Sequence, residues 1–462
     1  MAISTSDSVL ALLKVWYKDG VENLLFRNSP LLKALKKERV EGKTQNFSAI
    51  YGRGGAVGGT WTYAKSKAAN GARNAEFSVT PGQVFSVYSM NAKEVQASLS
   101  KRGAYMKVAG NKMFGATEGL RKTLGAALYG RGFGEIAVLS LSESTQIATT
   151  GTEITLPDDA IIKIDVGTSL AFKTSISATT ITGTATVDSI NGNTVKVLAE
   201  TSAFTVANGD VVCLAGSMAN GQPKLPVGLD GWLPCVGNRT GETWASYIAP
   251  SFFGVLRNIA SDRLAGAFVL GGETEKKSDT VQKLLRKVRR QGSLADMIVM
   301  NDDDFLAMSK EIEASNTYFT QTSTKGKKNA VMGFESFGAS FSTNYIENVI
   351  DDPYCPKSKF YILSSDAVAL WSYTNVDKVD DGVAGNNPGK QDPMTMDNDG
   401  NENKPAQLLI DDYLNVQPGE GGDDGPDVLV TLQMFGSFVV TNPSVCGVGI
   451  FNNATDYIGY AA

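Results

Sequence analysis

Residues 280–306 read TVQKLLRKVRRQGSLADMIVMNDDDFL, and this stretch carries helix and strand signals in close succession. From Val281 onward, apolar residues recur at three- and four-residue steps, as on one face of a helix. Gly292 signals a turn, and the unbroken apolar run at 297–300 predicts a buried strand. The acidic residues after Asn301 are typical of the first turn of another helix. The stretch therefore predicts a helix–turn–strand–helix unit in an α+β domain.

Residues 91–129 predict one long helix. Their apolar residues recur at helical spacing, no proline interrupts them, and Gly130 is a stop signal. At 1.5 Å per residue, such a helix would be roughly 55–60 Å long. Its glycines weaken it by up to about 1 kcal/mol each, so we expect close packing along it and interpret it as a structural spine.

Residues 136–222 form a compositional island rich in Thr, Ser, Val and Ile. Asn191-Gly192 lies between two β-like runs and predicts a hairpin. We expect a small all-β module of five or six strands, inserted after the long helix. The predicted strands include 160–166, 181–187, 194–198 and 211–215.

The ends of the chain carry weaker signals. Residues 6–19 predict a short amphipathic helix, and a second short helix is expected at 31–37, after Pro30. Residues 376–427 are dominated by Asp, Asn, Gly and Pro and predict a long acidic surface loop. Residues 428–440 are strand-like and are expected to close the fold at the turn Asn442-Pro443.

Residues 42–90 hold eight glycines, seven aromatic residues and five basic side chains against one acid. Glycine-rich backbone loses much entropy on ordering, and no neighbouring sequence supplies a core for these rings. Disordered linkers, however, are poor in aromatics. We therefore predict a long hairpin, marginal in isolation, that is ordered by the surface of another subunit. The predicted intersubunit contacts are Tyr51, Arg53, Trp61, Tyr63, Lys65, Lys67, Arg73 and Phe77.

The absence of histidine from the chain excludes Ser-His-Asp, Cys-His and HExxH chemistry. The four cysteines are far apart and form no CxxC pair, so neither a zinc site nor a disulfide framework is indicated, and a reducing cytoplasm fits. No apolar run approaches the ~18 residues of a membrane span, and the first residues do not resemble a signal peptide. We expect no catalytic residue, no metal and no cofactor.

The net charge of −5 is unevenly distributed. Residues 1–135 carry 20 Lys and Arg against 9 Asp and Glu, whereas residues 291–462 carry 9 against 25. This pattern fits either two ordinary domains or a basic front that attracts the acidic back of a neighbouring copy. Complementary potentials of the second kind guide docking and register. DNA binding by the basic front is a third option, although its Lys and Arg form no compact cluster.

Four short motifs have simpler structural explanations. Residues 52–55 (GRGG) lack the ending of a phosphate-binding loop and predict a turn. Residues 302–304 (DDD) suit free N–H groups at a helix start better than a metal. Residues 397–400 (DNDG) lack the acids that an EF-hand needs at its first and twelfth positions. The basic residues within 286–290 predict a solvated helix face rather than a phosphate or DNA patch.

The order of these parts resembles the major capsid proteins of tailed bacteriophages, which have the Hong Kong 97-type fold. The most specific segment is 280–306, supported by Gly228-Leu229, by residues 331–371 and by the ending at 434–443. The likeness covers most of the chain outside 136–222, a region similar to the β insertion domains of some members. It implies an N-terminal arm at 1–41, an extended loop (E-loop) over a neighbour at 42–90, a peripheral-domain (P-domain) spine helix at 91–135, an inserted all-β domain at 136–222, a P-domain continuation at 223–275, an A-domain at 276–427 and C-terminal P-domain strands at 428–462.

The resemblance implies a structural shell protein rather than an enzyme. Its copies would form the pentamers and hexamers of an icosahedral phage head around double-stranded DNA, assembled in the host bacterial cytoplasm and located in the virion. Implied partners are other copies, a separate scaffolding protein, a portal, a decoration protein in some relatives, and DNA through non-specific contact, with no membrane. Some relatives crosslink a lysine to an asparagine, but no matching motif surrounds Lys65 or Lys67.

Two alternatives stay open at this point. An encapsulin-like compartment would share the fold and enclose a protein cargo. A carboxylate-dependent enzyme acting on polysaccharide could use residues 136–222 as a binding module.

Overall fold

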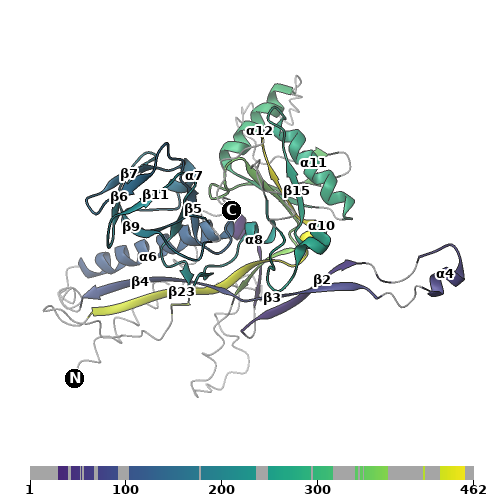
Figure 1. Cartoon of the computed structure of the whole chain (residues 1–462), viewed down its shortest axis with the longest axis horizontal. Coiled ribbons are helices and arrows are strands. Elements are labelled where there is room, and N and C mark those ends of the chain that lie inside the picture. Colours follow the sequence, from purple (N-terminus) through teal and green to yellow (C-terminus); the bar gives the residue numbers. More distant parts are fainter. Residues whose placement is uncertain are drawn as a thin grey trace, which may run out of the picture. The chain divides into compact units, whose positions relative to one another are not determined.

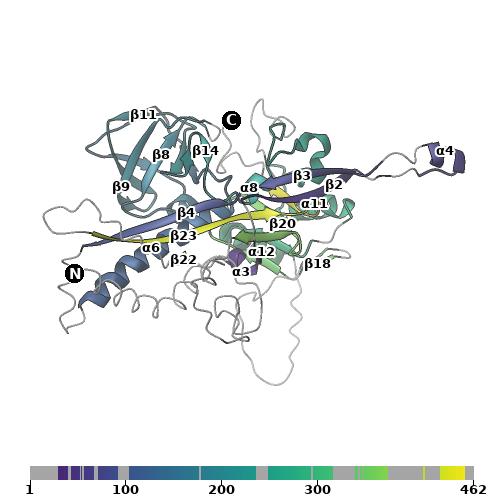
Figure 2. The same cartoon turned by 90° about the horizontal axis from the view of Figure 1, so that it is seen from below.

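The chain is described here from a computed structural model, and its described residues divide into two compact units (Figures 1 and 2). The first unit comprises residues 1–41, 81–227 and 370–438, and the second comprises 42–80, 228–369 and 439–462. The structure describes residues 30–39, 43–52, 54, 57–66, 71–91, 104–175, 178–235, 248–292, 295–315, 339–341, 344–346, 348–372, 409–410 and 427–452.

A long two-stranded ribbon and one long helix are the main elements of the first unit outside its β module. Strand β4 (Gly82–Asn91) pairs antiparallel with β23 (Asp427–Val440), and helix α6 (Ala104–Leu128) lies along them (Figure 2). The long helix is thus confirmed, but its predicted start at Asn91 is wrong. Asn91 pairs with Asp427 as the last residue of β4, a partner too distant in sequence for local spacing to show.

The β4–β23 ribbon belongs to a five-stranded sheet that also includes β1, the first strand of the described residues. Its strands run in the order β1 (Lys36–Arg39), β21 (Val368–Ser372), β23 and β22 (Leu409–Ile410). Helix α3 (Pro30–Ala34) precedes β1 and buries leucines, so the short helix after Pro30 is confirmed, but it ends before the predicted 37. The predicted helix at 6–19 and most of the acidic segment at 376–427 lie outside the described residues.

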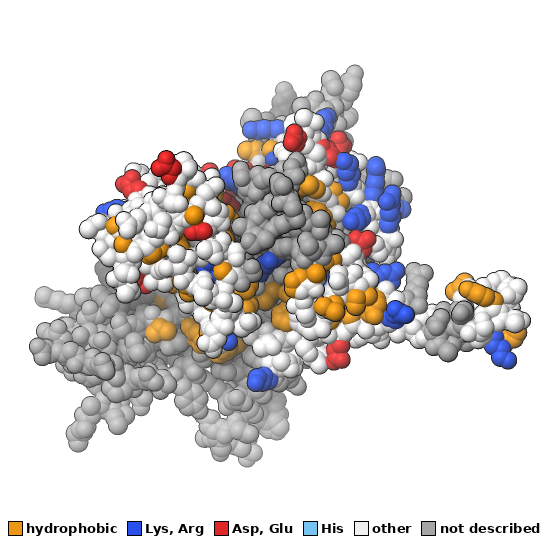
Figure 3. All heavy atoms as spheres, in the orientation of Figure 1, with side chains coloured by type: hydrophobic (Ala, Val, Ile, Leu, Met, Phe, Trp, Pro, Cys, Tyr) orange, Lys and Arg blue, Asp and Glu red, His pale blue; other side chains and the backbone are white. Residues whose placement is uncertain are grey.

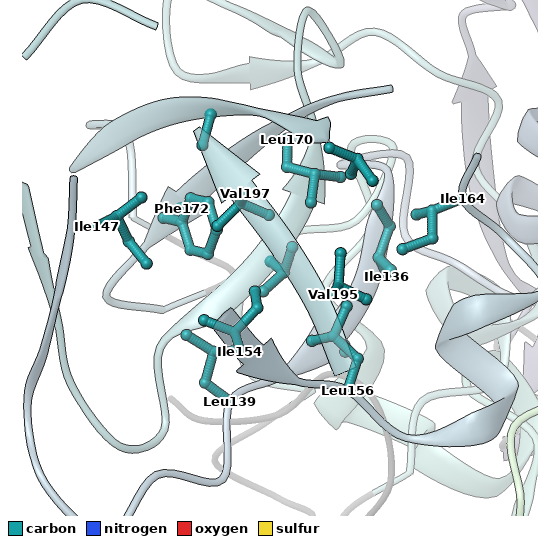
Figure 4. Close-up of a cluster of buried hydrophobic side chains, with 14 of the residues drawn as sticks. Ile136, Leu139, Ile147, Ile154, Leu156, Ile164, Leu170, Phe172, Val195 and Val197 are labelled. Carbon is teal, nitrogen blue, oxygen red and sulfur yellow. The ribbon is translucent and has the colours of Figure 1, made fainter. Parts of the chain in front are cut away.

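The rest of the first unit is a β module with its own apolar core (Figure 4). Around its main sheet lie the pairs β6–β11 (Thr145–Ile147, Phe204–Val206) and β13–β14 (Met218–Ala219, Gln222–Pro223). The main sheet contains, in spatial order, β5 (Glu135–Val138), β12 (Val211–Leu214), β8 (Ser169–Lys173), β9 (Gly183–Asn191), β10 (Thr194–Ala199) and β7 (Thr152–Thr155).

Two predictions within this module have different outcomes. The hairpin around Asn191-Gly192 is confirmed, because β9 and β10 pair antiparallel and Gly192 has the positive φ, 55°, that a tight hairpin turn requires. The strand predicted at 160–166 is wrong. Helix α7 (Asp158–Ile161) begins after Pro157 and buries Ala160. The apolar run therefore packs against the core as a short helix instead of a strand.

The second unit contains a mixed five-stranded sheet covered by helices. Its order is β15 (Ala267–Leu270), β24 (Gly447–Ile450), β20 (Lys359–Leu363), β16 (Met297–Met300) and β19 (Asn348–Asp351). The β15–β24 and β16–β19 pairs are parallel, whereas β20 is antiparallel to both of its neighbours. The expectation that the strands end at Asn442-Pro443 is wrong: that turn is the short helix η2 (Pro443–Val445), and β24 follows it.

Residues 280–306 form the predicted helix, turn, strand and helix. Helix α11 (Lys277–Arg290) buries Val281, Leu284 and Val288, and all four residues of β16 are buried. Helix α12 (Asp302–Ser315) follows directly. The remaining elements of this unit are α8 (Leu229–Trp232), η1 (Arg257–Ala260), α10 (Ser261–Leu264), β17 (Ala339–Phe341), β18 (Asn344–Ile346) and the hairpin described below.

The acidic start of α12 has a structural role. Asn301 Oδ1 accepts a hydrogen bond from the Asp303 amide at 3.1 Å, as an N-cap does. Asp304 is 5% exposed, pairs with Lys277 Nζ at 2.6 Å and accepts a bond from the Ser358 amide. It therefore ties α12 to α11. In the described part of the chain, no group of three Cys, Asp or Glu could hold a metal ion.

A buried ion pair joins α8 to the sheet. Lys359 of β20 and Asp230 of α8 form a salt bridge while 0% and 2% exposed, and the Tyr361 hydroxyl donates to the same carboxylate. Burial by itself would lower the pKa of Lys359, but Asp230 and Cys235 raise it, and the net shift is upward. Lys359 therefore remains charged, and its pairing depends on Asp230.

The described part of the chain contains all four cysteines and no membrane-spanning helix candidate. All four cysteines are free and buried, and burial raises the pKa of the Cys446 thiol to about 12. No helix in the described ranges is long and apolar enough to cross a membrane.

Replacing Asp230 tests the buried pair. We expect Asp230→Asn to lower the free energy of unfolding by about 3–5 kcal/mol, because Lys359 would be left buried and charged without its carboxylate. The matched control is Asp188→Asn, which breaks the half-exposed pair with Lys196 and should cost at most about 1 kcal/mol. Urea unfolding followed by circular dichroism measures both. Equal losses in the two variants would contradict the assignment.

Candidate assembly surface

The glycine- and aromatic-rich segment forms a β-hairpin in the second unit (Figure 1). Strand β2 (Gln45–Gly52) pairs antiparallel with β3 (Arg73–Val79), and α4 (Trp61–Ser66) lies in the connection between them. The predicted hairpin is therefore confirmed. The pairing sets Phe47 directly opposite Phe77, which puts both rings on one face of the ribbon.

An aromatic cluster holds the root of this hairpin. The Phe47 and Phe77 rings stack with centroids 5.2 Å apart, and Phe77 lies 5.5 Å from the Trp232 ring. The Trp232 ring in turn packs against Phe252 and Phe253, with ring centroids 5.0 Å and 5.4 Å away. Phe77 and Trp232 are both 0% exposed. The root is thus part of the hydrophobic core of its own chain.

Polar contacts fix the residues around Trp232. Arg257 Nη1 donates to the Gly231 carbonyl at 2.8 Å, and its guanidinium lies 4.2 Å from the centre of the Phe252 ring. The Ser78 amide donates to the Phe253 carbonyl at 3.0 Å, which adds a backbone link between β3 and this loop. Phe253 has φ of 47°, an uncommon conformation for a bulky residue that the surrounding contacts must hold.

The expectation that the surface of another subunit orders these aromatic rings is therefore wrong for the root. The rings of Phe47 and Phe77 are covered by residues roughly 150 or more positions away in the sequence. The composition of residues 42–90 gives no information about partners so distant in the sequence.

Beyond the root, glycines allow the two sides of the hairpin to approach each other closely. The ladder shifts register after Ile50, where Gly52 lies opposite Arg73. A Cβ on Gly54 would lie 2.3 Å from the Ala72 amide nitrogen, so no larger residue fits without moving the backbone. A Cβ on Gly58 would lie 2.6 Å from the Tyr63 ring. Hence these glycines shape the connection rather than merely loosening it.

The far end of the hairpin exposes apolar side chains (Figure 3). Trp61 is 79% exposed and Tyr63 is 54% exposed, while Ile50 and Val57 are 65% and 95% exposed. Helix α4 buries none of its residues. A group of exposed large apolar residues on one hairpin is typical of an interaction surface. We call residues 50–66 and 71–73 the hairpin tip.

The predicted contact residues have different positions on this hairpin. Trp61, Tyr63, Lys65 and Arg73 are exposed, whereas Tyr51 is half-buried. Phe77 is fully buried in its own chain, so it is removed from the set of surface contacts. Arg53 and Lys67 lie outside the described residues. Ile50 and Val57 are further exposed apolar residues of the hairpin that the sequence analysis does not single out.

Comparisons with known proteins assign the fold. No family model matches the sequence, and no curated protein matches it. Among solved structures, the chain is similar to the capsid asymmetric unit of cyanophage A-1(L), with a TM-score of 0.51 and 13% identity over 92% of both chains. Because this likeness extends over nearly the whole chain, the chain has the α+β fold of phage capsid proteins, as the sequence resemblance predicts.

Two further structures are more distantly similar. A Mycobacterium phage Adephagia structure has a TM-score of 0.39 and 11% identity over 92% of this chain and 90% of that one. A virus-like particle from Pyrococcus furiosus has a TM-score of 0.35 and 8% identity over 93% and 96%.

Stability measurements separate the root of the hairpin from its tip. We expect Phe77→Ala to cost about 3–5 kcal/mol of unfolding free energy, because it leaves a cavity beside Trp232. Trp61→Ala should change it by less than about 0.5 kcal/mol, because the ring is exposed. Thermal and urea unfolding of both variants measure the difference. A large loss from Trp61→Ala would show that the tip packs within its own chain.

Proposed function

We propose that this chain, which has the fold of phage capsid proteins, is the major capsid protein of a tailed phage. Its copies would form pentamers and hexamers and, through them, an icosahedral shell that encloses double-stranded DNA. The observation that carries the proposal is the combination of this fold with a rigidly rooted hairpin whose tip exposes Trp61 and Tyr63.

The hairpin supports assembly because its two ends have opposite properties. The buried root fixes where the hairpin leaves its own unit, and the tip offers apolar surface that a neighbouring copy can bury. Shell subunits can bury more than the standard interface area of roughly 1,600 Å². In that case, the contacts that stabilise the tip form only in the assembly, and their formation depends on subunit concentration.

The described elements suggest how the parts of a Hong Kong 97-type subunit map onto the chain. The β2–β3 hairpin would be the E-loop, and α6 the spine helix of the P-domain. The β module would be an inserted domain, since it has a core of its own. The sheet that contains β16 and β20 would form the A-domain. Strand β4, first assigned to the E-loop, pairs with β23 and fits the P-domain better.

Partners other than further copies follow from the same proposal. A separate scaffolding protein and a portal would take part in assembly in the bacterial cytoplasm, and the finished shell would hold DNA through non-specific contacts. The basic first third of the chain and its acidic last third would guide neighbouring copies into register. No catalytic role is part of the proposal.

The alternative functions receive less support. No observation on the described residues favours an encapsulin-like compartment with a protein cargo, and none favours a polysaccharide-active enzyme. Neighbouring terminase and portal genes would identify a phage shell, whereas a neighbouring cargo gene would identify a compartment.

Shortening the hairpin tests the proposed function. Replacing residues 53–72 by Asn-Gly should close the hairpin beyond Gly52 and Arg73 with a two-residue turn and leave the root intact. We expect wild-type protein to form capsomers or shells, and the shortened protein to stay folded and soluble without closing shells. Negative-stain microscopy and sedimentation velocity measure assembly.

The control is Val166→Ala, which removes an apolar side chain that is 64% exposed on the β module. It should assemble like the wild type. Normal shells from the shortened protein would overturn the proposed role of the tip, and a wild-type protein that stays monomeric at high concentration would overturn the shell function itself.

A further inference from the structure

The direction of the strands gives the five-stranded sheet of the second unit two distinct ends. Strands β15, β24, β16 and β19 all run the same way, because β15–β24 and β16–β19 are parallel pairs and β20 is antiparallel to both β24 and β16. Their last residues therefore lie at one end of the sheet, the carboxyl end, and their first residues lie at the other, the amino end. Helix α11 leads from β15 to β16, so it runs from the carboxyl end to the amino end over about 20 Å.

Arginines gather where α11 reaches the amino end of the sheet, and Lys and Arg side chains cover the face over this helix in Figure 3. Arg286, Arg289 and Arg290 are exposed, and none of their side chains forms an ion pair or hydrogen bond with another described residue. The three lysines of α11, by contrast, all pair with carboxylates of the same chain. The exposed Asp366 follows β20 at this end and offsets only part of the positive charge.

Acids gather at the carboxyl end of the same sheet. They follow β15 and β16, end β19 or lie in the first turn of α11, and the exposed ones are Glu273, Asp279, Asp302, Asp303 and Asp351. Lys276 is exposed near them, and Lys357 pairs with Asp303 at 2.6 Å, so the balance at this end remains negative. Helix dipoles favour acids in a first turn, but Glu273 and Asp351 lie in neither helix. Helix capping therefore accounts for only part of this acidic surface.

Opposite charges at opposite ends of one sheet suit a head-to-tail contact between two copies. Complementary potentials orient docking partners and fix their register. A head-to-tail contact that repeats closes into a ring when its rotation permits. Nucleic acid would account for the arginines alone, whereas a second copy accounts for both charged ends.

We propose that the exposed arginines of α11 in one copy bind the acidic carboxyl end of this sheet in the next copy, with Arg286 and Arg290 facing Asp302 and Asp351. The contact repeats around a ring and sets the direction in which copies follow one another. This inference rests on the proposed shell function and assigns to it a contact surface other than the hairpin tip.

Charge reversal tests the contact in the full-length protein. The basic-end variant is Arg286→Glu with Arg290→Glu, and the acidic-end variant is Asp302→Lys with Asp351→Lys. Each should raise the protein concentration at half-maximal assembly roughly tenfold or more, because like charges then face each other. The combination of all four substitutions should recover assembly, because the charges are again complementary with their signs exchanged. Sedimentation velocity and negative-stain microscopy at about 50 mM salt, where screening is weak, measure assembly.

The matched control changes the net charge by the same amount away from both ends of the sheet. It is Lys196→Glu with Lys224→Glu, two positions on the β module, and it should assemble like the wild type. Circular dichroism shows whether each variant is folded.

Interchain crosslinking keeps the contact testable if a reversed variant does not fold. The four native cysteines are buried, so cysteines introduced at exposed positions can be linked selectively by a short bismaleimide. A mixture of Arg290→Cys copies with Asp302→Cys copies should give an interchain link several-fold more abundant than a mixture of Arg290→Cys copies with Lys224→Cys copies. Equal yields would overturn the contact.

The remaining outcomes separate this contact from the shell function. Reversed variants that assemble like the wild type, or a folded four-substitution variant that does not recover, would overturn the contact and leave the shell function standing. A basic-end variant that assembles normally but retains less DNA would show that the arginines bind DNA instead. Wild-type protein that stays monomeric would overturn both the contact and the shell function.

Discussion

The packing of Phe77 between Phe47 and Trp232 is the contact on which the hairpin depends. A two-stranded ribbon is marginal alone, because its hydrogen bonds exchange with water and its glycines cost entropy. Burial of a large apolar side chain contributes roughly 1.5–3 kcal/mol. At the root, Phe77 and Trp232 are fully buried, and the other rings of the cluster pack against them. The cluster therefore gives a marginal hairpin a fixed base, from which the tip can present exposed apolar residues.

That base is itself coupled to the sheet of the second unit. Trp232 lies in the same short helix, α8, as Asp230, whose carboxylate binds Lys359 and Tyr361 of β20. Arg257 Nη1 donates to the Gly231 and Trp232 carbonyls of α8. A buried ion pair contributes little net stability, but it specifies geometry, since each partner is costly without the other. In this way, β20 orients α8, and α8 orients the ring that anchors the hairpin.

Local patterns predicted the parts of the fold whose partners are close in sequence. Residues 280–306 reveal α11, β16 and α12, because helical spacing, one glycine turn and an apolar run follow each other directly. The hairpin at Asn191-Gly192 is equally local. Long-range pairing explains the errors. The sequence predicts too early a start for α6, because β4 pairs with β23, more than 300 positions away. It gives little signal for β24, because the strand is short and follows the turn at Asn442-Pro443.

The candidate surface was predictable to a similar extent. The composition of residues 42–90 identified a segment with exposed aromatics, and Trp61 and Tyr63 are exposed as expected. Composition could not separate them from Phe77, because burial by Trp232 depends on tertiary structure alone.

An electron cryo-microscopy map of the assembled protein tests the central claim most directly. The account predicts that Trp61 and Tyr63 contact a neighbouring copy while Phe77 remains against Trp232 of its own chain. Tip residues left in solvent in a closed shell would contradict it.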